Sequence, residues 1–119
     1  MGLLNQQFDL LTRLLAASEQ RQQVISHNIA NVNTPKYQRL DLKFEELLAR
    51  EFESEKRGHT VTRSTPQLQH TPGLQARPDG NNVDIDMEIG QLNKNALLQQ
   101  VYLQLMSTEL GQMRRAMKS

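Results

Sequence analysis

A heptad pattern at each end of the chain constrains its fold more than any other feature. The first stripe comprises Leu4, Phe8, Leu11, Leu15, Ser18, Gln22, Ile25, Ile29 and Val32. No proline or glycine interrupts it, and alternating spacings of four and three over about four heptads are typical of a coiled-coil helix. At ~1.5 Å per residue this helix would be about 40 Å long. The polar Ser18 and Gln22 either set register and partner choice or lie in solvent on a curved helix.

The last third of the chain carries a second stripe of the same kind. It comprises Ile89, Leu92, Ala96, Gln99, Leu103, Met106, Leu110, Met113 and Met117. Leu98, Val101, Tyr102 and Leu105 lie beside it and make the apolar face wider than a seam between two helices. Carboxylates between Asp84 and Glu88 suit the N-terminus of this helix. The alternation of apolar and acidic residues from Val83 to Glu88 indicates a short extended piece that leads into it.

The middle of the chain has a different pattern. Residues from Asp41 to Phe52 predict a short amphipathic helix, and from Glu55 to Asn82 no apolar period is present, which predicts an irregular polar arm. The predicted fold is all-α: two long N- and C-terminal heptad helices pack as a coiled-coil-like pair, joined by the short helix and the arm. The expected divisions are 1–35 for the first helix and an Asn-rich turn, 36–82 for the short helix and arm, and 83–119 for the last helix.

Composition narrows the possible functions. Hydrophobic residues make up 37% and aromatic residues 4% of the chain, which is little for a core that one copy could build alone. The net charge of +1, with both signs interspersed, predicts no binding of nucleic acid or anionic membrane. The absence of cysteine excludes disulfides, zinc–thiolate sites and cysteine nucleophiles. No apolar run approaches the roughly 20 residues of a membrane span, and we expect no cleaved secretory signal.

No enzyme activity, metal or cofactor is expected either. Ser26 and His27 are adjacent on a helix, so their side chains point in directions about 100° apart. His59 and His70 lie in the arm without the spacing of metal ligands. The stretch DGNNVDIDME is only superficially similar to a calcium loop, because Asp84 stands where such a loop requires glycine.

The first helix ends in the stretch NIANVNTPKYQ, which contains three asparagines. An asparagine tolerates left-handed backbone and can bond to the free carbonyls of a last helical turn, which explains one of them. The Thr34–Pro35 step then forces the chain out of the helix, because the proline ring clashes with the preceding backbone. The other asparagines require a further explanation.

This stretch resembles the N-terminal signature of the bacterial flagellar rod and hook proteins, in which a heptad helix ends in Asn-x-x-Asn, then Thr-Pro and an aromatic residue. The residues that match are Asn28, Ile29, Asn31, Thr34, Pro35 and Tyr37. The family often has glycine where Lys36 stands. The stretch DGNNVDIDMEI, before the second stripe, resembles the second family segment. The short arm is similar to that of proximal-rod members, since the distal rod and hook relatives carry larger inserted domains.

The resemblance implies a structural subunit of the proximal rod of the flagellar basal body, on the periplasmic side of the inner membrane. Family members are exported without a cleaved signal peptide and form a homo-oligomeric helical tube, which transmits torque and serves as an export conduit. The implied partners are other rod proteins, membrane-ring (MS-ring) and rod-adaptor proteins, and the flagellar type III export apparatus. Neither nucleic acid nor direct membrane insertion is implied.

On this interpretation the assembly interface comprises residues of both stripes and of the signature: Leu4, Phe8, Leu11, Leu15, Ile25, Asn28, Ile29, Asn31, Val32, Thr34, Pro35, Tyr37, Ile89, Leu92, Ala96, Leu103, Met106, Leu110, Met113 and Met117. We expect some asparagines to close the turn and others to bond to neighbouring subunits, with their amides hydrated in the free monomer. The alternative function is a soluble α-helical coiled-coil adaptor or regulator that binds a single partner.

Overall fold

The structure is a computed structural model that describes residues 2–59 and 63–118. For residues 2–4 it describes the backbone only, so the expectation for the Leu4 side chain lies outside the described residues. In chain order the elements are α1 (Gly2–Ala30), β1 (Leu40–Lys43), α2 (Glu45–Lys56), β2 (Gln67–His70) and α3 (Ile85–Lys118).

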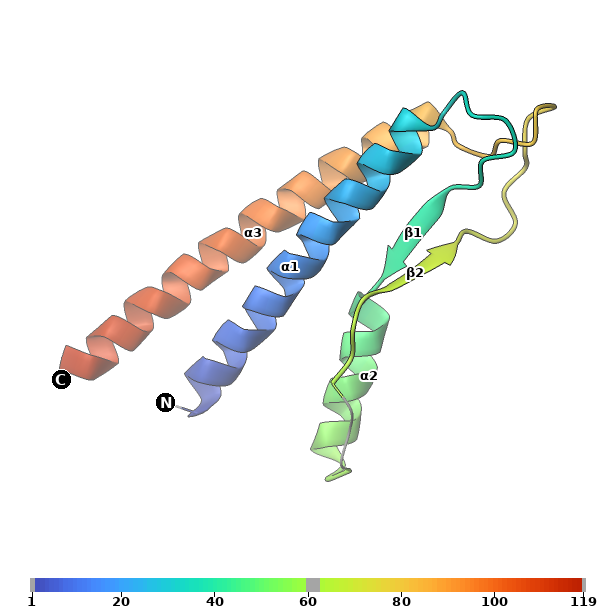
Figure 1. Ribbon diagram of the computed structural model, residues 1–119. Helices are drawn as coiled ribbons and strands as arrows, with labels where there is room; N and C mark the ends of the chain where they lie inside the picture. Colours follow the sequence, from blue (N-terminus) through green and yellow to red (C-terminus); the bar gives the residue numbers. More distant parts are fainter. Residues whose placement is uncertain (1, 60–62, 119) are drawn as a thin grey trace.

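The two terminal helices form the long body of the molecule. α1 and α3 run side by side in opposite directions, so both ends of the chain lie at one end of the body (Figure 1). The opposite end, where α1 finishes and α3 begins, is called the apex below. The molecule measures 64 × 31 × 14 Å, so it is long and flat. The prediction of a mainly helical fold with two long terminal helices packed together is confirmed.

α1 lies between α3 and the rest of the chain, and it is packed on both sides. The described positions of its heptad stripe are buried or half-buried, and Leu11 and Ile25 are 8% and 3% exposed. On its other side Ala17 packs with Phe44 and Leu48 in a small core. Because α1 packs against α3 on one side and against Phe44 and Leu48 on the other, its apolar residues are spread over more than one face of the helix.

β1, α2 and β2 form a unit that runs back from the apex beside α1 (Figure 1). β1 and β2 are antiparallel, with Leu40 opposite His70 and Lys43 opposite Gln67. The prediction that the helix starts at Asp41 was wrong for the first residues, which lie in β1, and the prediction of an irregular arm was wrong at β2. Four-residue strands are too short to show a period, and every side chain of β2 is exposed, so no apolar pattern marked it.

α3 begins at Ile85, inside the range that its carboxylates predicted. The Asp84 carboxylate accepts hydrogen bonds from the backbone N–H groups of Asp86 (3.0 Å) and Met87 (3.3 Å), as an N-cap residue does. The prediction of an extended piece from Val83 to Glu88 was therefore wrong from Ile85 onward, because this cap starts the helix earlier than the alternation suggested.

The apolar stripe of α3 divides between the inside and the outside of the molecule. The positions on the side of α1 are half-buried: Leu92, Gln99, Met106 and Met113. The positions that alternate with them are exposed: Ile89, Ala96, Leu103, Leu110 and Met117. Only one half of the stripe therefore faces α1, and the other half is exposed on the surface of the molecule. α1 instead contacts α3 closer to Glu88 and Asn95, which are 0% and 1% exposed, and an apolar pattern could not reveal these polar positions.

Candidate assembly interface

The apex is held by buried polar side chains, and Asn28 lies at its centre with 0% exposure. Its Oδ1 accepts hydrogen bonds from the Tyr37 hydroxyl and from the backbone N–H of Leu40, both at 2.9 Å. Its Nδ2 donates to the Leu40 carbonyl at 2.8 Å and to the Glu88 carboxylate at 3.3 Å. An asparagine side chain has two donor and two acceptor positions. Asn28 uses all four inside one chain.

Asn81, also 0% exposed, closes the end of α1 from the other family segment. Its Nδ2 donates to the carbonyls of Asn31 (2.8 Å), Val32 (3.1 Å) and Thr34 (2.8 Å), in the turn that follows α1. Its Oδ1 accepts from the Val83 N–H at 2.7 Å. The two segments that resemble the family signature therefore form one hydrogen-bonded unit, although about fifty residues separate them in the sequence.

A buried ion pair joins Arg39, the residue before β1, to Glu88 in the first turn of α3. The Arg39 guanidinium donates to the Glu88 carboxylate through Nε at 2.5 Å and Nη2 at 3.2 Å. Both side chains are almost fully buried, with 4% and 0% exposure. Arg39 also donates through Nη1 to Thr71 Oγ1 at 2.6 Å, and its backbone N–H donates to Asn82 Oδ1 at 2.7 Å. Sequence patterns missed this pair, because its partners are far apart and no local spacing links them.

The signature residues meet at the apex, but they do so inside one chain. Asn31 Nδ2 donates to the His27 carbonyl at 2.8 Å, and its Oδ1 accepts from Thr34 Oγ1 at 3.0 Å. Burial at the apex raises the pKa of the Tyr37 hydroxyl, which therefore stays protonated as a donor to Asn28. The expectation that the asparagine amides stay hydrated until assembly was wrong for Asn28, because the folded chain itself satisfies and covers them.

The backbone at Lys36 gives a first testable prediction. Its φ is +66°, in the left-handed region that favours glycine, and its N–H donates to the Asp79 carbonyl. We expect Lys36→Gly to raise the free energy of unfolding by about 0.5–1 kcal/mol, because glycine removes the strain at Cβ and loses part of that gain in chain entropy. Urea unfolding of wild type and variant measures this difference in the free energy of unfolding. Lys36→Ala keeps a Cβ and should give no gain; an equal gain from alanine would contradict the explanation.

A polar layer fixes the register of α1 against α3. Asn95 Nδ2 donates to the Ser18 carbonyl at 2.8 Å and to Gln22 Oε1 at 3.1 Å. Ser18 is 1% exposed. Of the two interpretations of this position, burial in the seam is confirmed for Ser18 and solvation is wrong. Such a layer favours one alignment of the helices, because every other alignment would leave these groups unpaired.

A second ion pair ties α2 to α1. Arg13 donates to the Glu51 carboxylate through Nη1 at 2.7 Å and Nη2 at 3.1 Å. Arg13 also donates to the Ser64 carbonyl, and the Ser64 N–H donates back to Glu51. The hydrogen bond from Arg13 lowers the pKa of Glu51 to about 2, assisted by the bond from Ser64 and opposed by burial.

This pair predicts a loss of stability in acid. The pKa of Glu51 is lower in the folded chain than in the unfolded chain, so its contribution is present above about pH 4.5 and is lost as the pH falls towards 2. We expect wild type to lose roughly 2–3 kcal/mol from this group over that range, and Glu51→Gln to show a flatter profile. Urea unfolding at several pH values measures the difference. Glu53→Gln, at an exposed position on the same helix, should keep the wild-type profile.

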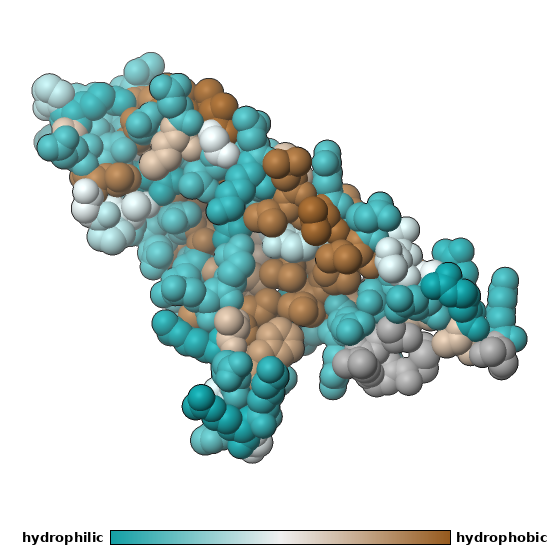
Figure 2. Space-filling view, turned by 180° about the vertical axis from the view of Figure 1, so that it is seen from behind, coloured by the Kyte–Doolittle hydropathy of each residue, from teal (hydrophilic) through white to brown (hydrophobic). Residues whose placement is uncertain are grey.

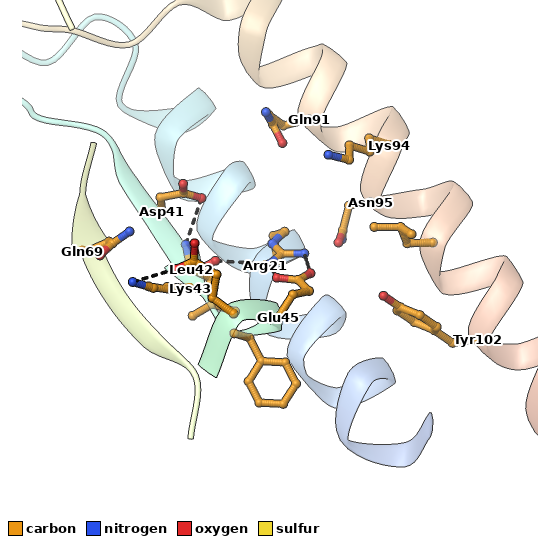
Figure 3. Close-up of a pocket in the computed structure, with 13 residues that line it drawn as sticks. Arg21, Asp41, Leu42, Lys43, Glu45, Gln69, Gln91, Lys94, Asn95 and Tyr102 are labelled. Atoms are coloured by element: carbon orange, nitrogen blue, oxygen red, sulfur yellow. Dashed lines mark hydrogen bonds and ion pairs between the residues drawn. The ribbon is translucent and has the colours of Figure 1, made fainter. Parts of the chain in front are cut away.

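A groove separates α3 from the β1–α2 junction, and Figure 3 shows the side chains that line it. We call this groove the wedge; its volume is about 640 Å³. The Arg21 guanidinium, from α1, donates to both oxygens of Glu45 at 2.7 Å. On the same side, Lys43 pairs with Glu46 at 2.9 Å. Most charges of the wedge are thus neutralised within the chain.

Exposed apolar residues are concentrated on α3. Of the eleven large apolar residues that are exposed in the described chain, eight lie on this helix. Seven of them form two groups, which we call flank A (Ile85, Ile89, Leu103 and Leu110, together with the exposed Ala96) and flank B (Leu97, Val101 and Leu105). At ~100° per residue the flanks lie roughly 150° apart around the helix. From behind, the largest group of apolar side chains lies over the middle of the body (Figure 2).

Other kinds of site are not found in the part of the chain that the structure describes. It contains no cluster of three or more histidine, aspartate or glutamate residues that could hold a metal ion. Within the same residues, no helix is both long and apolar enough to cross a membrane. His27 Nδ1 lies 2.8 Å from the Tyr37 hydroxyl and is part of the apex network.

Comparisons with known proteins agree with the signature. A family model described as flagella basal body rod protein matches residues 13–38, which cover most of α1 and the turn after it. The chain is 31% identical to the flagellar basal body rod protein FlgB of Escherichia coli K12, over 84% of each chain. It is 28% identical to FlgB of Buchnera aphidicola, over 97% of this chain and 96% of the relative. FlgB of Bacillus subtilis is 27% identical, over 96% and 95%.

These matches extend across both terminal helices and the apex between them. The identity to the Escherichia coli protein and its coverage are sufficient to establish common family membership. The chain therefore belongs to the FlgB family of flagellar basal body rod proteins.

Proposed function

We propose that the chain is a structural subunit of the proximal rod of the bacterial flagellar basal body. Copies polymerise through their terminal helices into a helical tube, which transmits torque and serves as an export conduit. The relatives are named as basal body rod proteins, which supports the rod assignment. No catalytic role is part of the proposal.

The observation that carries the proposal is the pair of apolar flanks on α3. α1 covers only one side of α3, and flanks A and B are left in solvent on nearly opposite sides. Fully burying a large aliphatic side chain contributes about 1.5–3 kcal/mol. A contact between unlike surfaces of identical copies repeats from copy to copy and builds a ring or a helical filament. Two opposite flanks on one long helix suit such a repeat.

The partners and location follow from the proposed role. Beyond further copies, the partners are other rod proteins, the MS-ring and rod-adaptor proteins, and the type III export apparatus. The rod lies on the periplasmic side of the inner membrane, and the subunit reaches it without cleavage of a signal peptide. The charge balance of the chain, +1, supports contacts with proteins rather than with nucleic acid.

A soluble adaptor that binds one partner is the alternative. An adaptor needs one apolar groove or face, which a single partner would cover. The two flanks lie roughly 150° apart at ~100° per residue, so no single helix could cover both. We therefore favour the polymer.

The test uses a bacterium from which the gene for this chain has been deleted. Wild-type chain, and a copy with an epitope tag in the exposed loop 72–76, should both restore swimming. Cryo-electron microscopy of basal bodies should then show the tag at the proximal rod. Complete proximal rods in the deletion strain would refute the proposal, as would a functional tag located elsewhere.

A further inference from the structure

We propose that residues 110–118, the end of α3, bind in an apolar groove of a different protein whose rim carries carboxylates. The inference goes beyond the proposed function, because it states the chemistry of a second kind of partner and the segment that holds it. It does not depend on how copies of the chain contact one another. In Figure 1 this end of α3, coloured red, lies at one end of the body and away from the β1–α2–β2 unit.

Three apolar side chains of the segment share one side of the helix, and we call them the anchors. Leu110, Met113 and Met117 have the spacing i, i+3 and i+7, which is typical of a helix that binds in an apolar groove. At ~100° per residue they lie within about 60° of one another. Leu110 is 42% and Met117 78% exposed, and Met113 is half-buried. The anchors therefore retain apolar area that only another molecule can cover.

Three cations lie beside the anchors. Arg114, Lys118 and Arg115 follow at about 40°, 80° and 140° around the helix from Leu110, and all three are exposed. None of them forms an ion pair with another described residue. Glu109 lies on the other side of the anchors. The helix dipole explains a cation in the last turn, but not three cations along one side of an exposed apolar stripe. Carboxylates on the rim of a groove would complement this arrangement.

A second copy of the chain has no matching surface among its described residues. The exposed carboxylates of α2 alternate with the cations Arg50, Lys56 and Arg57. At the start of α3, Asp84 is occupied as the N-cap, which leaves Asp86 as a single free carboxylate. The other exposed carboxylates are ion-paired or stand alone. Three cations on one side of a helix therefore favour a partner of different sequence.

The same residues favour a protein over a membrane surface. Segments that bind anionic membranes usually carry about four to eight cations, and this segment has three. It also has no tryptophan or phenylalanine, which interfacial helices use to enter the lipid. Methionine side chains instead adapt to irregular apolar grooves of proteins.

The test uses the deletion strain, complemented with the chain. The photo-cross-linking residue p-benzoylphenylalanine replaces Met117, or Leu110 in a second strain, and intact cells are irradiated. Mass spectrometry of the adduct then identifies the cross-linked peptide. We expect a peptide from a different protein, in which several aspartates or glutamates accompany apolar residues.

Capture alone is not sufficient, so the charges are tested next. The triple variant Arg114→Gln, Arg115→Gln and Lys118→Gln should lower the yield of the cross-link about tenfold, because three pairs at the rim are lost. Replacing the same three residues by glutamate should abolish the cross-link. Lysines in place of the carboxylates of the identified peptide should then restore it.

Two controls match these variants. The photo-cross-linker at Gln112, an exposed position on another side of the helix, should give far less of the same adduct. The triple variant Arg50→Gln, Lys56→Gln and Arg57→Gln removes the same charge from exposed positions on and after α2, and should leave the yield unchanged.

Several results would overturn the inference while leaving the rod function intact. These are a cross-link to a second copy, to lipid or to a peptide without carboxylates, and equal yields from Gln112 and the anchor positions. An unchanged yield after loss of the three cations of α3 would overturn it too. Absence of the wild-type chain from basal bodies would instead refute the proposed function.

Discussion

Glu88→Ala is expected to lower the free energy of unfolding by about 3–5 kcal/mol, the usual cost of removing one partner from a buried ion pair. Arg39 would stay buried at 3% exposure without a counter-charge, and Asn28 Nδ2 would lose one of its two acceptors. Native stabilities are about 5–15 kcal/mol, so much of the apex would open. Urea unfolding followed by circular dichroism measures the change.

Two control variants distinguish loss of the ion pair from a general destabilisation of α3. Asp86→Ala removes an exposed carboxylate from the same helical turn and should change stability by no more than about 0.5 kcal/mol. The double variant Arg39→Met with Glu88→Leu removes both charges and should be more stable than Glu88→Ala alone. A Glu88→Ala protein within about 1 kcal/mol of wild type would show that water compensates Arg39.

Leu103→Asp is expected to abolish swimming while the isolated chain stays folded. Leu103 is 54% exposed, so an aspartate there remains solvated in the monomer, but assembly would bury its charge at a cost of several kcal/mol. Ile25→Asp should behave differently, because Ile25 is 3% exposed and the charge would unfold the monomer itself. The measurements are halo size in soft agar, chain recovered in basal bodies, and the helical signal of the purified chain.

The control for Leu103→Asp is Gln104→Asp, which adds the same charge at the next residue, on an exposed polar face of α3. This variant should swim normally. Normal swimming and normal recovery of Leu103→Asp in basal bodies would remove Leu103 from the assembly interface. Unfolding of the purified Leu103→Asp chain would show that the position matters to the monomer instead.

The sequence showed the family signature, but it did not show which groups the signature side chains bond to. The spacing of Asn28, Asn31 and Tyr37 identified a resemblance and suggested contacts between subunits. The structure shows that Asn28 is instead saturated by groups from β1, the turn and α3. A list of residue types tells which groups need partners, but the partner of a side-chain amide depends on the path of the whole chain.

The sequence by itself determined the two terminal helices and the range of residues in which the second of them begins. These features depend on interactions within a few residues, so a local apolar period or a local run of carboxylates reveals them. Only the tertiary structure decided the pairing of β1 with β2, the burial of Arg39 against Glu88, and which half of the α3 stripe stays exposed. Each of these joins groups far apart in the chain. Their energies therefore depend on how α1, β1 and α3 meet, which no window of the sequence contains.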